Sequence, residues 1–172
     1  MRYALMRQMD VSNGAGLGVA LFVQGCHFHC KGCFNRDTWP FTGGENWTPA
    51  AERQFMSLVA RPYIRRVSIL GGEPLARENR EAVLRLILHL RHDFPDKKIW
   101  VYTGYPWEEV VDGADNTMHL IANHVDVIVD GRFVEELRDL TLPFRGSSNQ
   151  RIIDCKKSLA EGHVVLWQNS HS

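Results

Sequence analysis

The sequence predicts one α/β domain built on a parallel sheet, and three observations support this prediction. Short apolar runs alternate along the chain with segments of helical period, which is the order of βαβ units. The 172 residues suit a single domain with a sizeable core. The hydrophobic fraction of 44% and the charged fraction of 23% are ordinary for a globular protein. We therefore treat residues 1–172 as one domain.

Four apolar runs are predicted to be the buried strands of this sheet. They cover residues 19–23, 67–70, 99–102 and 125–129. Short apolar runs bounded by turn residues are typical of buried strands. Near the end of the chain, residues 151–154 and 164–167 are candidates for further strands.

Three helices are predicted between the strands. Thr48 followed by Pro49 is typical of a helix start, with a capping hydroxyl and then proline at the first helical position. The second helix covers residues 78–94, and the third covers 107–123 with Gly113 as a weak point. The apolar spacing predicts that the core-facing residues are Phe55, Met56 and Val59 in the first helix and Val83, Ile87, Leu90 and Phe94 in the second.

Charge and hydropathy exclude two classes of protein. The 20 Lys and Arg balance 20 Asp and Glu, and this formal net charge of +0 lacks the basic excess of a nucleic-acid-binding protein. No uncharged apolar stretch approaches the roughly 20 residues that cross a membrane. Residues 1–10 also lack the apolar stretch and cleavage site of a signal peptide. We therefore expect a cytoplasmic protein whose thiols are kept reduced.

Polar or glycine-containing segments follow each of the four predicted strands. A cysteine-rich segment follows the first strand, and Gly-Gly-Glu-Pro at 71–74 follows the second. Thr-Gly-Tyr at 103–105 follows the third, and Asp-Gly at 130–131 follows the fourth. Because the carboxyl ends of parallel strands meet at one edge, we expect these segments to form a single active site.

The cysteine-rich segment has the spacing of an iron–sulfur site. Cys26, Cys30 and Cys33, here called the loop cysteines, follow the pattern C-x3-C-x2-C. Three thiolates can hold three corners of a cluster that is normally bound by four cysteines. The fourth iron then stays open, and an open position distinguishes catalytic from structural metal sites.

Two alternatives to this three-cysteine cluster remain open from the residues alone. The first is a zinc site in which His27 or His29 is the fourth ligand. The second is a cluster with Cys155 as its fourth ligand. Nothing near Cys155 resembles a metal loop, so we interpret it as a small buried hydrophobic residue.

The cysteine spacing after one strand, with Gly-Gly-Glu-Pro after the next, resembles the radical S-adenosylmethionine superfamily. More closely, the chain resembles the activating proteins of the anaerobic (class III) ribonucleotide reductases. The matching residues are Asn13-Gly14, Leu21-Phe22-Val23, Gly25-Cys26, Gly32-Cys33-Phe34-Asn35, Thr38-Trp39, Gly71-Gly72-Glu73-Pro74-Leu75, Thr103-Gly104-Tyr105, Val129-Asp130-Gly131 and Arg145-Gly146-Ser147-Ser148-Asn149-Gln150. Gly-Ser-Ser-Asn-Gln and Gly-Cys-Phe-Asn favour this branch over the pyruvate formate-lyase activase.

This resemblance implies a fold and an activity. The fold is a partial TIM-like βα barrel, since 172 residues fall short of the roughly 250 of a full barrel. The loop cysteines hold a [4Fe–4S] cluster whose open iron chelates S-adenosylmethionine. An electron from a flavodoxin-type donor cleaves this cofactor to a 5′-deoxyadenosyl radical, which generates a glycyl radical on the anaerobic ribonucleoside-triphosphate reductase. The protein would thus be a glycyl-radical-generating oxidoreductase.

The resemblance also suggests which residues contact the cofactor. We expect the backbone carbonyls around the two glycines of Gly-Gly-Glu-Pro to accept hydrogen bonds from its ammonium group. The glutamate would add negative charge nearby, and an aromatic ring beside the third cysteine would cover the adenine. The residues expected at the cofactor are Gly32, Cys33, Phe34, Gly71, Gly72, Glu73 and Asp130.

Other functions remain as alternatives. The chain could activate another glycyl radical enzyme of the pyruvate formate-lyase type, or it could be a radical enzyme acting on a small molecule. A non-catalytic zinc-binding module is the third alternative. A partial barrel leaves its side open to a peptide loop, and the chain has no added domain to enclose a small substrate. These features favour a protein substrate.

Overall fold

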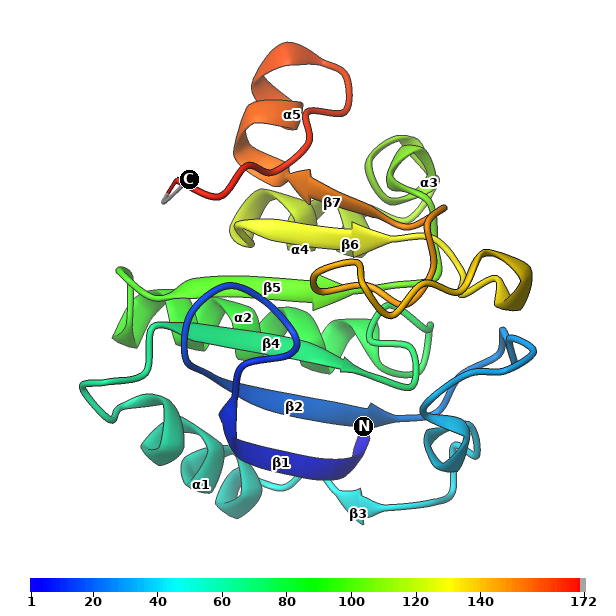
Figure 1. Ribbon diagram of the computed structural model, residues 1–172. Coiled ribbons are helices and arrows are strands. Elements are labelled where there is room, and N and C mark those ends of the chain that lie inside the picture. The colour runs from blue at the N-terminus through cyan, green and yellow to red at the C-terminus, as the bar shows by residue number, and fades with distance from the viewer. Residues whose placement is uncertain (171–172) are drawn as a thin grey trace.

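A computed structural model describes residues 1–170 and contains one seven-stranded sheet in the order β3-β1-β2-β4-β5-β6-β7 (Figure 1). The strands are β1 Arg2–Asp10, β2 Gly18–Gln24, β3 Glu45–Asn46, β4 Arg66–Gly71, β5 Lys98–Tyr102, β6 Val127–Asp130 and β7 Arg151–Asp154. Neighbours among β2, β4, β5 and β6 pair in parallel. At the two edges, β1, β3 and β7 pair antiparallel. The α/β class and the parallel strands are confirmed, but the sheet as a whole is mixed.

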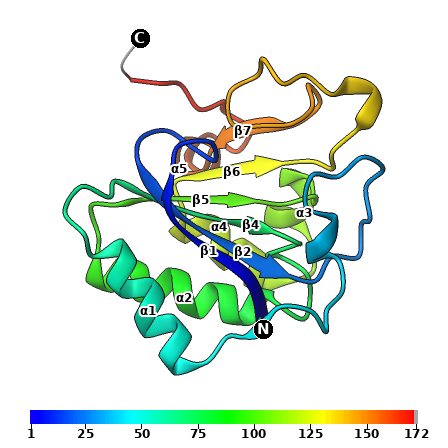
Figure 2. The ribbon, with the colours of Figure 1, turned by 60° about the horizontal axis from the view of Figure 1, so that its bottom comes forward.

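The helices cover one face of this sheet. They are α1 Pro49–Val59, α2 Arg80–Asp93, α3 Trp107–Asp112, α4 Asn116–His124 and α5 Cys155–Glu161, with single 3₁₀ turns at Arg36–Thr38 and Glu135–Leu137. Figures 1 and 2 show α1, α2 and α4 on one side, whereas the β1–β2 loop and the segment 131–150 lie over the other side. Within residues 1–170, no helix is long and apolar enough to cross a bilayer.

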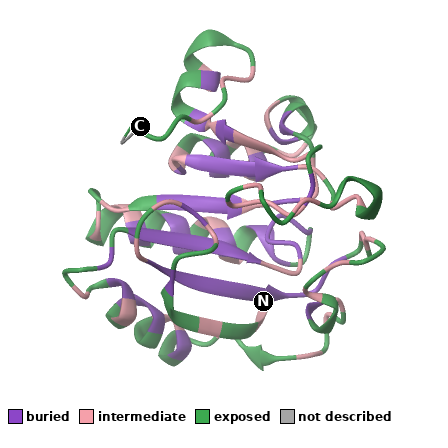
Figure 3. Cartoon of the chain, viewed as in Figure 1, coloured by how far each residue is buried: buried purple, intermediate pink, exposed green. Residues whose placement is uncertain are grey.

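The central parallel strands are buried on both faces (Figure 3). Every residue of β2 is buried. Val19, Leu21 and Val23 pack into the core beneath the helices, while Ala20 and Phe22 pack on the opposite face. This double burial explains why the sequence shows a continuous apolar run here rather than alternation.

The helix predictions are confirmed with one correction. The Thr48 hydroxyl accepts a hydrogen bond from Ala51 N at 3.1 Å, as the capping pattern predicts. The predicted helix over 107–123 is wrong as a single element, because α3 ends at Asp112 and α4 starts at Asn116. The Asp115 carboxylate accepts hydrogen bonds from two backbone N–H groups of the next turn and so starts a new helix.

Four further elements differ from the sequence prediction. The two-residue strand β3 was not predicted. β1 was not predicted, because this strand is largely exposed and carries polar residues along its length. α5 was also missed. Residues 164–167 do not form a strand, since only Leu166 bridges to Ile153 of β7.

A buried arginine fixes the β1–β2 loop over the open face of the sheet. The Arg66 guanidinium is completely buried and donates to the carboxylate of Asp10 at 2.9 Å and to the carbonyl of Asn13 at 3.1 Å. Burial alone would raise the pKa of Asp10, but hydrogen bonds from Arg66 and Asn13 outweigh this effect and hold the pKa below its ordinary value. These bonds therefore fix the position of the β1–β2 loop on this face of the sheet.

Candidate functional site

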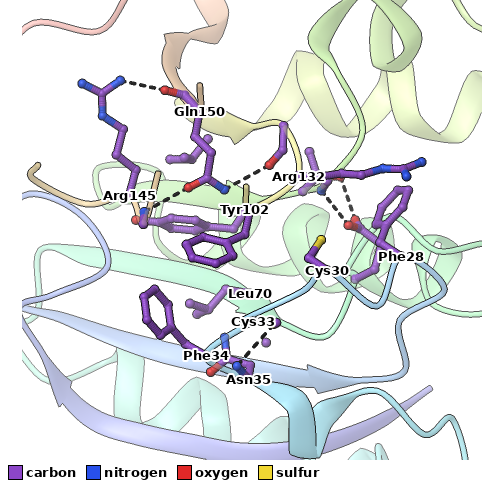
Figure 4. Close-up of a pocket in the computed structure, with 18 of the residues that line it drawn as sticks. Phe28, Cys30, Cys33, Phe34, Asn35, Leu70, Tyr102, Arg132, Arg145 and Gln150 are labelled. Atoms are coloured by element: carbon purple, nitrogen blue, oxygen red, sulfur yellow. Dashed lines mark hydrogen bonds between the residues drawn. The ribbon is translucent and has the colours of Figure 1, made fainter. Parts of the chain in front are cut away.

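A cavity of about 320 Å³ lies at the carboxyl ends of the parallel strands (Figure 4). The loop cysteines form one wall, and the ends of β4, β5 and β6 form its base. Residues from the segment 131–150 close the opposite side. The residues expected at the site that line this cavity are Cys26, Cys30, Cys33, Phe34, Gly71, Gly72 and Glu73.

The loop cysteines are positioned by a loop whose two ends are joined. Cys26 N donates to the carbonyl of Trp39 at 3.0 Å, so the start of the loop lies beside its end. Cys33 N donates to the carbonyl of Cys30 at 3.1 Å and closes a tight turn. Asn35 N donates a hydrogen bond to the sulfur of Cys33 at 3.4 Å. This backbone arrangement directs all three cysteines to the same cavity.

The environments of the cysteines differ. Burial raises the pKa of the thiols of Cys26 and Cys30, which line the cavity. Burial raises the pKa of Cys155 much further, and this residue lies in the core beneath the helices with no exposed surface. All four cysteines are free thiols. Cys155 therefore sits away from the cavity, as its interpretation as a small buried hydrophobic residue predicts.

The histidines of the cysteine loop are engaged elsewhere. His27 Nε2 lies 2.9 Å from the Glu78 carboxylate, and the His29 ring stacks on Trp39 at a centroid distance of 4.5 Å. In the described part of the chain, no three His, Cys, Asp or Glu side chains converge on a point that could hold a single metal ion. A four-iron cluster takes each cysteine on a different iron, so its ligands surround a volume instead of meeting at one point. The cavity fits a cluster better than a single zinc ion.

Two buried donors without acceptors also indicate an occupant. Among the described residues, the buried side-chain nitrogens that lack any hydrogen-bond partner are Trp39 Nε1 and Arg145 Nε. Both residues line the cavity. Since buried donors are nearly always paired, the site suits a group rich in acceptors, such as the sulfurs of a cluster or the carboxylate of a cofactor.

The Gly-Gly-Glu-Pro segment crosses directly over the start of the cysteine loop. Gly72 N donates to Val23 O at 2.9 Å, and Glu73 N donates to Gly25 O at 2.7 Å. A Cβ atom on Gly72 would lie 2.4 Å from the carbonyl oxygen of Gly25. Gly71 has a φ of +105°, in the region that favours glycine. The two glycines are thus required by the backbone crossing itself, whatever else binds there.

Glu73 connects the end of β4 to the end of β5. Its carboxylate accepts hydrogen bonds from Leu75 N at 2.9 Å, the Thr103 hydroxyl at 2.7 Å and Gly104 N at 2.7 Å. Burial raises the pKa of Glu73 to about 7, against the opposing effect of these donors. The carboxyl group lining the cavity therefore titrates near neutral pH rather than in the acidic range.

Asp130 and Gly32 do not line the cavity. The Asp130 carboxylate accepts hydrogen bonds from Arg151 Nη2 at 2.6 Å and from Trp107 N at 2.8 Å, so it joins β6 to β7 and to the start of α3. The residues on either side of it, Val129 and Gly131, do line the cavity, and Gly131 has a φ of +96°. Gly32 forms a turn with a φ of +76°, and a Cβ atom there would lie 3.0 Å from the Glu135 carboxylate.

The segment 131–150 supplies cavity residues that sequence reasoning missed. Figure 4 shows Arg132 beside Phe28, whose ring centroid lies 4.4 Å from the guanidinium carbon. Phe34 is 55% exposed and packs against Phe133 at a centroid distance of 5.1 Å. Arg132 could have been predicted from its position, because it follows Asp130, the last residue of β6, by two residues and so lies at a strand end.

The Gly-Ser-Ser-Asn-Gln stretch holds this segment in place. The Gln150 side chain accepts a hydrogen bond from Gly146 N at 2.9 Å and donates to Gly131 O at 3.0 Å (Figure 4). Arg145 Nη1 donates to the carbonyl of Gln150 at 2.7 Å. These bonds close the segment on itself over the strand ends, and they give the stretch a structural role.

Comparisons with known proteins agree with this site. A family model described as a 4Fe-4S single cluster domain matches residues 12–153. The anaerobic ribonucleoside-triphosphate reductase-activating protein of Vibrio cholerae is 38% identical over 88% of this chain and 97% of its own length. The proteins of that name from Escherichia coli K12 and phage T4 are 39% and 36% identical, over 87% and 88% of this chain and 96% and 93% of their own.

Proposed function

Since this chain belongs to the family of anaerobic ribonucleoside-triphosphate reductase-activating proteins, we propose that it generates a glycyl radical on such a reductase. The observation that carries this proposal is the meeting of three cysteines and the Gly-Gly-Glu-Pro segment at one cavity. When bound, a [4Fe–4S] cluster supplies one electron that cleaves S-adenosylmethionine to methionine and a 5′-deoxyadenosyl radical, which takes a hydrogen atom from a glycine of the reductase.

The loop cysteines would each hold one iron of this cluster. Their position on one wall of the cavity supports this assignment, as does the location of Cys155 in the core. The iron without a cysteine would face the rest of the cavity, where the amino and carboxylate groups of S-adenosylmethionine bind.

The remaining cavity residues would orient the cofactor. The carbonyls of Gly71 and Gly72 are candidates to accept hydrogen bonds from its ammonium group, with the Glu73 carboxylate adding negative charge. Phe34 offers an aromatic surface for the adenine, and Arg132 brings a positive charge to the same cavity. Asp130 would act at a distance, by fixing the strand end from which Arg132 projects. Gly32 would act by allowing the turn between the second and third cysteines.

The arrangement of the sheet supports a partial TIM-like barrel. The parallel strands β2, β4, β5 and β6 follow one another in the sheet in chain order, with the main helices on one face. The opposite face corresponds to the inside of a barrel and carries the cavity. Such an incomplete barrel leaves room for a glycine loop of the reductase to enter.

The electron donor and the cellular location are part of the same proposal. A flavodoxin-type protein is our candidate for the donor, by the resemblance of this chain to its family. A reducing cytoplasm would suit a protein whose four cysteines are free thiols.

The test combines cluster-loaded protein, S-adenosylmethionine, dithionite and an anaerobic ribonucleoside-triphosphate reductase under anoxic conditions. We expect the EPR doublet of a glycyl radical, formed together with 5′-deoxyadenosine. A reductase with its radical glycine replaced by alanine is the control. A radical on pyruvate formate-lyase but not on the reductase would refute the proposed partner, and a preparation that binds only zinc would refute the activity.

A further inference from the structure

Trp39 separates the functional cavity from the outer surface of the cysteine loop. It lines the cavity on one side and, on the other, a second hollow lined by Cys26, His27, His29, Arg36, Pro40 and Phe41. Among the cavity residues, Cys26 and Trp39 are shared by both hollows. The indole ring therefore forms part of the wall directly beside a loop cysteine.

The ring of Trp39 is held from several directions. Its backbone carbonyl accepts the hydrogen bond from Cys26 N, and its backbone N–H donates to Arg36 O at 3.1 Å. Its ring stacks almost parallel on His29, with an interplanar angle of 11°, and the Arg36 guanidinium carbon lies 5.2 Å from the ring centroid. The backbone bonds fix the position of Trp39, and the contacts with His29 and Arg36 favour this orientation of its ring.

The indole nitrogen has no partner within the described chain. Trp39 Nε1 is buried and has no acceptor there. Buried tryptophan N–H groups usually have one, and an unpaired buried donor costs about 1–3 kcal/mol in general. The loop cysteines line the same cavity as this ring. A cluster bound by these cysteines would therefore offer sulfur atoms as acceptors for Trp39 Nε1.

We propose that the indole N–H of Trp39 donates a hydrogen bond to a sulfur of the bound iron–sulfur cluster, either a sulfide or a cysteine thiolate, and so raises the reduction potential of the cluster. This inference rests on the proposed function. Hydrogen bonds to the sulfurs are a known means by which proteins set cluster potentials. The reduced cluster is more negative than the oxidised one, so the donor stabilises the reduced form more and makes electron uptake easier.

The first measurement is the cluster potential of the Trp39→Phe variant, by anaerobic titration with EPR detection of the reduced cluster. Phenylalanine keeps an aromatic ring against His29 but lacks the N–H. At a fixed solution potential we expect the ratio of reduced to oxidised cluster to fall about tenfold, which is about 59 mV for a one-electron couple. Trp47→Phe is the matched control, because Trp47 donates to Glu52 at 3.2 Å and does not line the cavity.

The second measurement does not use the Trp39→Phe variant and so does not depend on whether that variant folds. Wild-type protein is labelled with ¹⁵N at the indole nitrogens, loaded and reduced, and examined by pulsed EPR. We expect a ¹⁵N coupling to the cluster that survives in Trp47→Phe. If the loaded wild-type cluster lacks this coupling, or if Trp39→Phe leaves the potential unchanged, the proposed role of Trp39 is overturned. The proposed function of the protein is not affected by either result. A wild-type protein that takes up no cluster overturns the proposed function, and this inference with it.

Discussion

Replacing Glu73 by glutamine tests the electrostatics at the base of the cavity. Burial raises the pKa of Glu73 to about 7 in the folded protein, whereas the ordinary value is 4.5. Between these values the folded state binds more protons than the unfolded state. The contribution of Glu73 to the free energy of unfolding should therefore fall as the pH rises from 4.5 to 7 and level off above that range.

The size of this effect follows from the two pKa values. Their separation, from 4.5 to about 7, corresponds to about 3 kcal/mol at roughly 1.36 kcal/mol per unit. The side chain is completely buried, so solvent screening does not reduce this figure much. Glutamine does not titrate, so the stability of wild type relative to Glu73→Gln should fall by this amount, mostly between pH 4.5 and 7.

The assay is denaturant unfolding of the cluster-free protein, followed by tryptophan fluorescence in anoxic, reducing buffer. The difference between wild type and Glu73→Gln at each pH removes the contributions of all other titrating groups. Glu81→Gln, at an exposed position on α2, controls for loss of a carboxylate and should show no such trend. A wild-type advantage that stays constant or grows with pH would refute the reasoning. It would mean that the three donors on Glu73 outweigh its burial.

Three other outcomes are expected. Replacing any loop cysteine by alanine should abolish cluster uptake and cofactor cleavage, whereas Cys155→Ala should keep both. The measurements are iron content and the yield of 5′-deoxyadenosine. Loss of iron in Cys155→Ala would contradict the ligand assignment. Gly72→Ala should destabilise the fold by about 1–3 kcal/mol in denaturant unfolding, since its Cβ atom would lie 2.4 Å from Gly25 O; wild-type stability would show that the crossing relaxes freely. Asp130→Asn should cost about 2–3 kcal/mol by the same measurement, because it weakens the charged hydrogen bonds to Arg151; an unchanged midpoint would contradict this structural role.

The parallel part of the fold was predictable because its strands are buried on both faces. Continuous apolar runs and the capping pattern at Thr48 carry that information locally. β1 carries no such signal, since most of its residues are exposed and only a few, such as Tyr3 and Met6, pack against the core. The break before α4 depends on the Asp115 cap, which outweighs a weak helical pattern that would otherwise continue.

The site was predictable where the motif is local in sequence. The cysteine spacing and Gly-Gly-Glu-Pro lie at adjacent strand ends, and both line the cavity. Residues from 131–150 were missed because their position depends on long-range hydrogen bonds of Gln150. The contact expected for Asp130 depended on which face of β6 carries its side chain. Val127 and Val129 pack on the cavity face and Ile128 packs under the helices, so Asp130 lies on the helix face, and a continuous apolar run does not reveal this alternation.

The complete burial of Cys155 gives the protein a simple chemical reporter. Its thiol has no exposed surface and a strongly raised pKa, so alkylating reagents cannot modify it while the core is intact. If the loop cysteines are the cluster ligands, a fully loaded and folded molecule offers no reactive thiol. In a mass spectrum, each of up to three maleimide adducts then reports one loop cysteine that no longer binds the cluster. A fourth adduct reports that the core has opened and exposed Cys155.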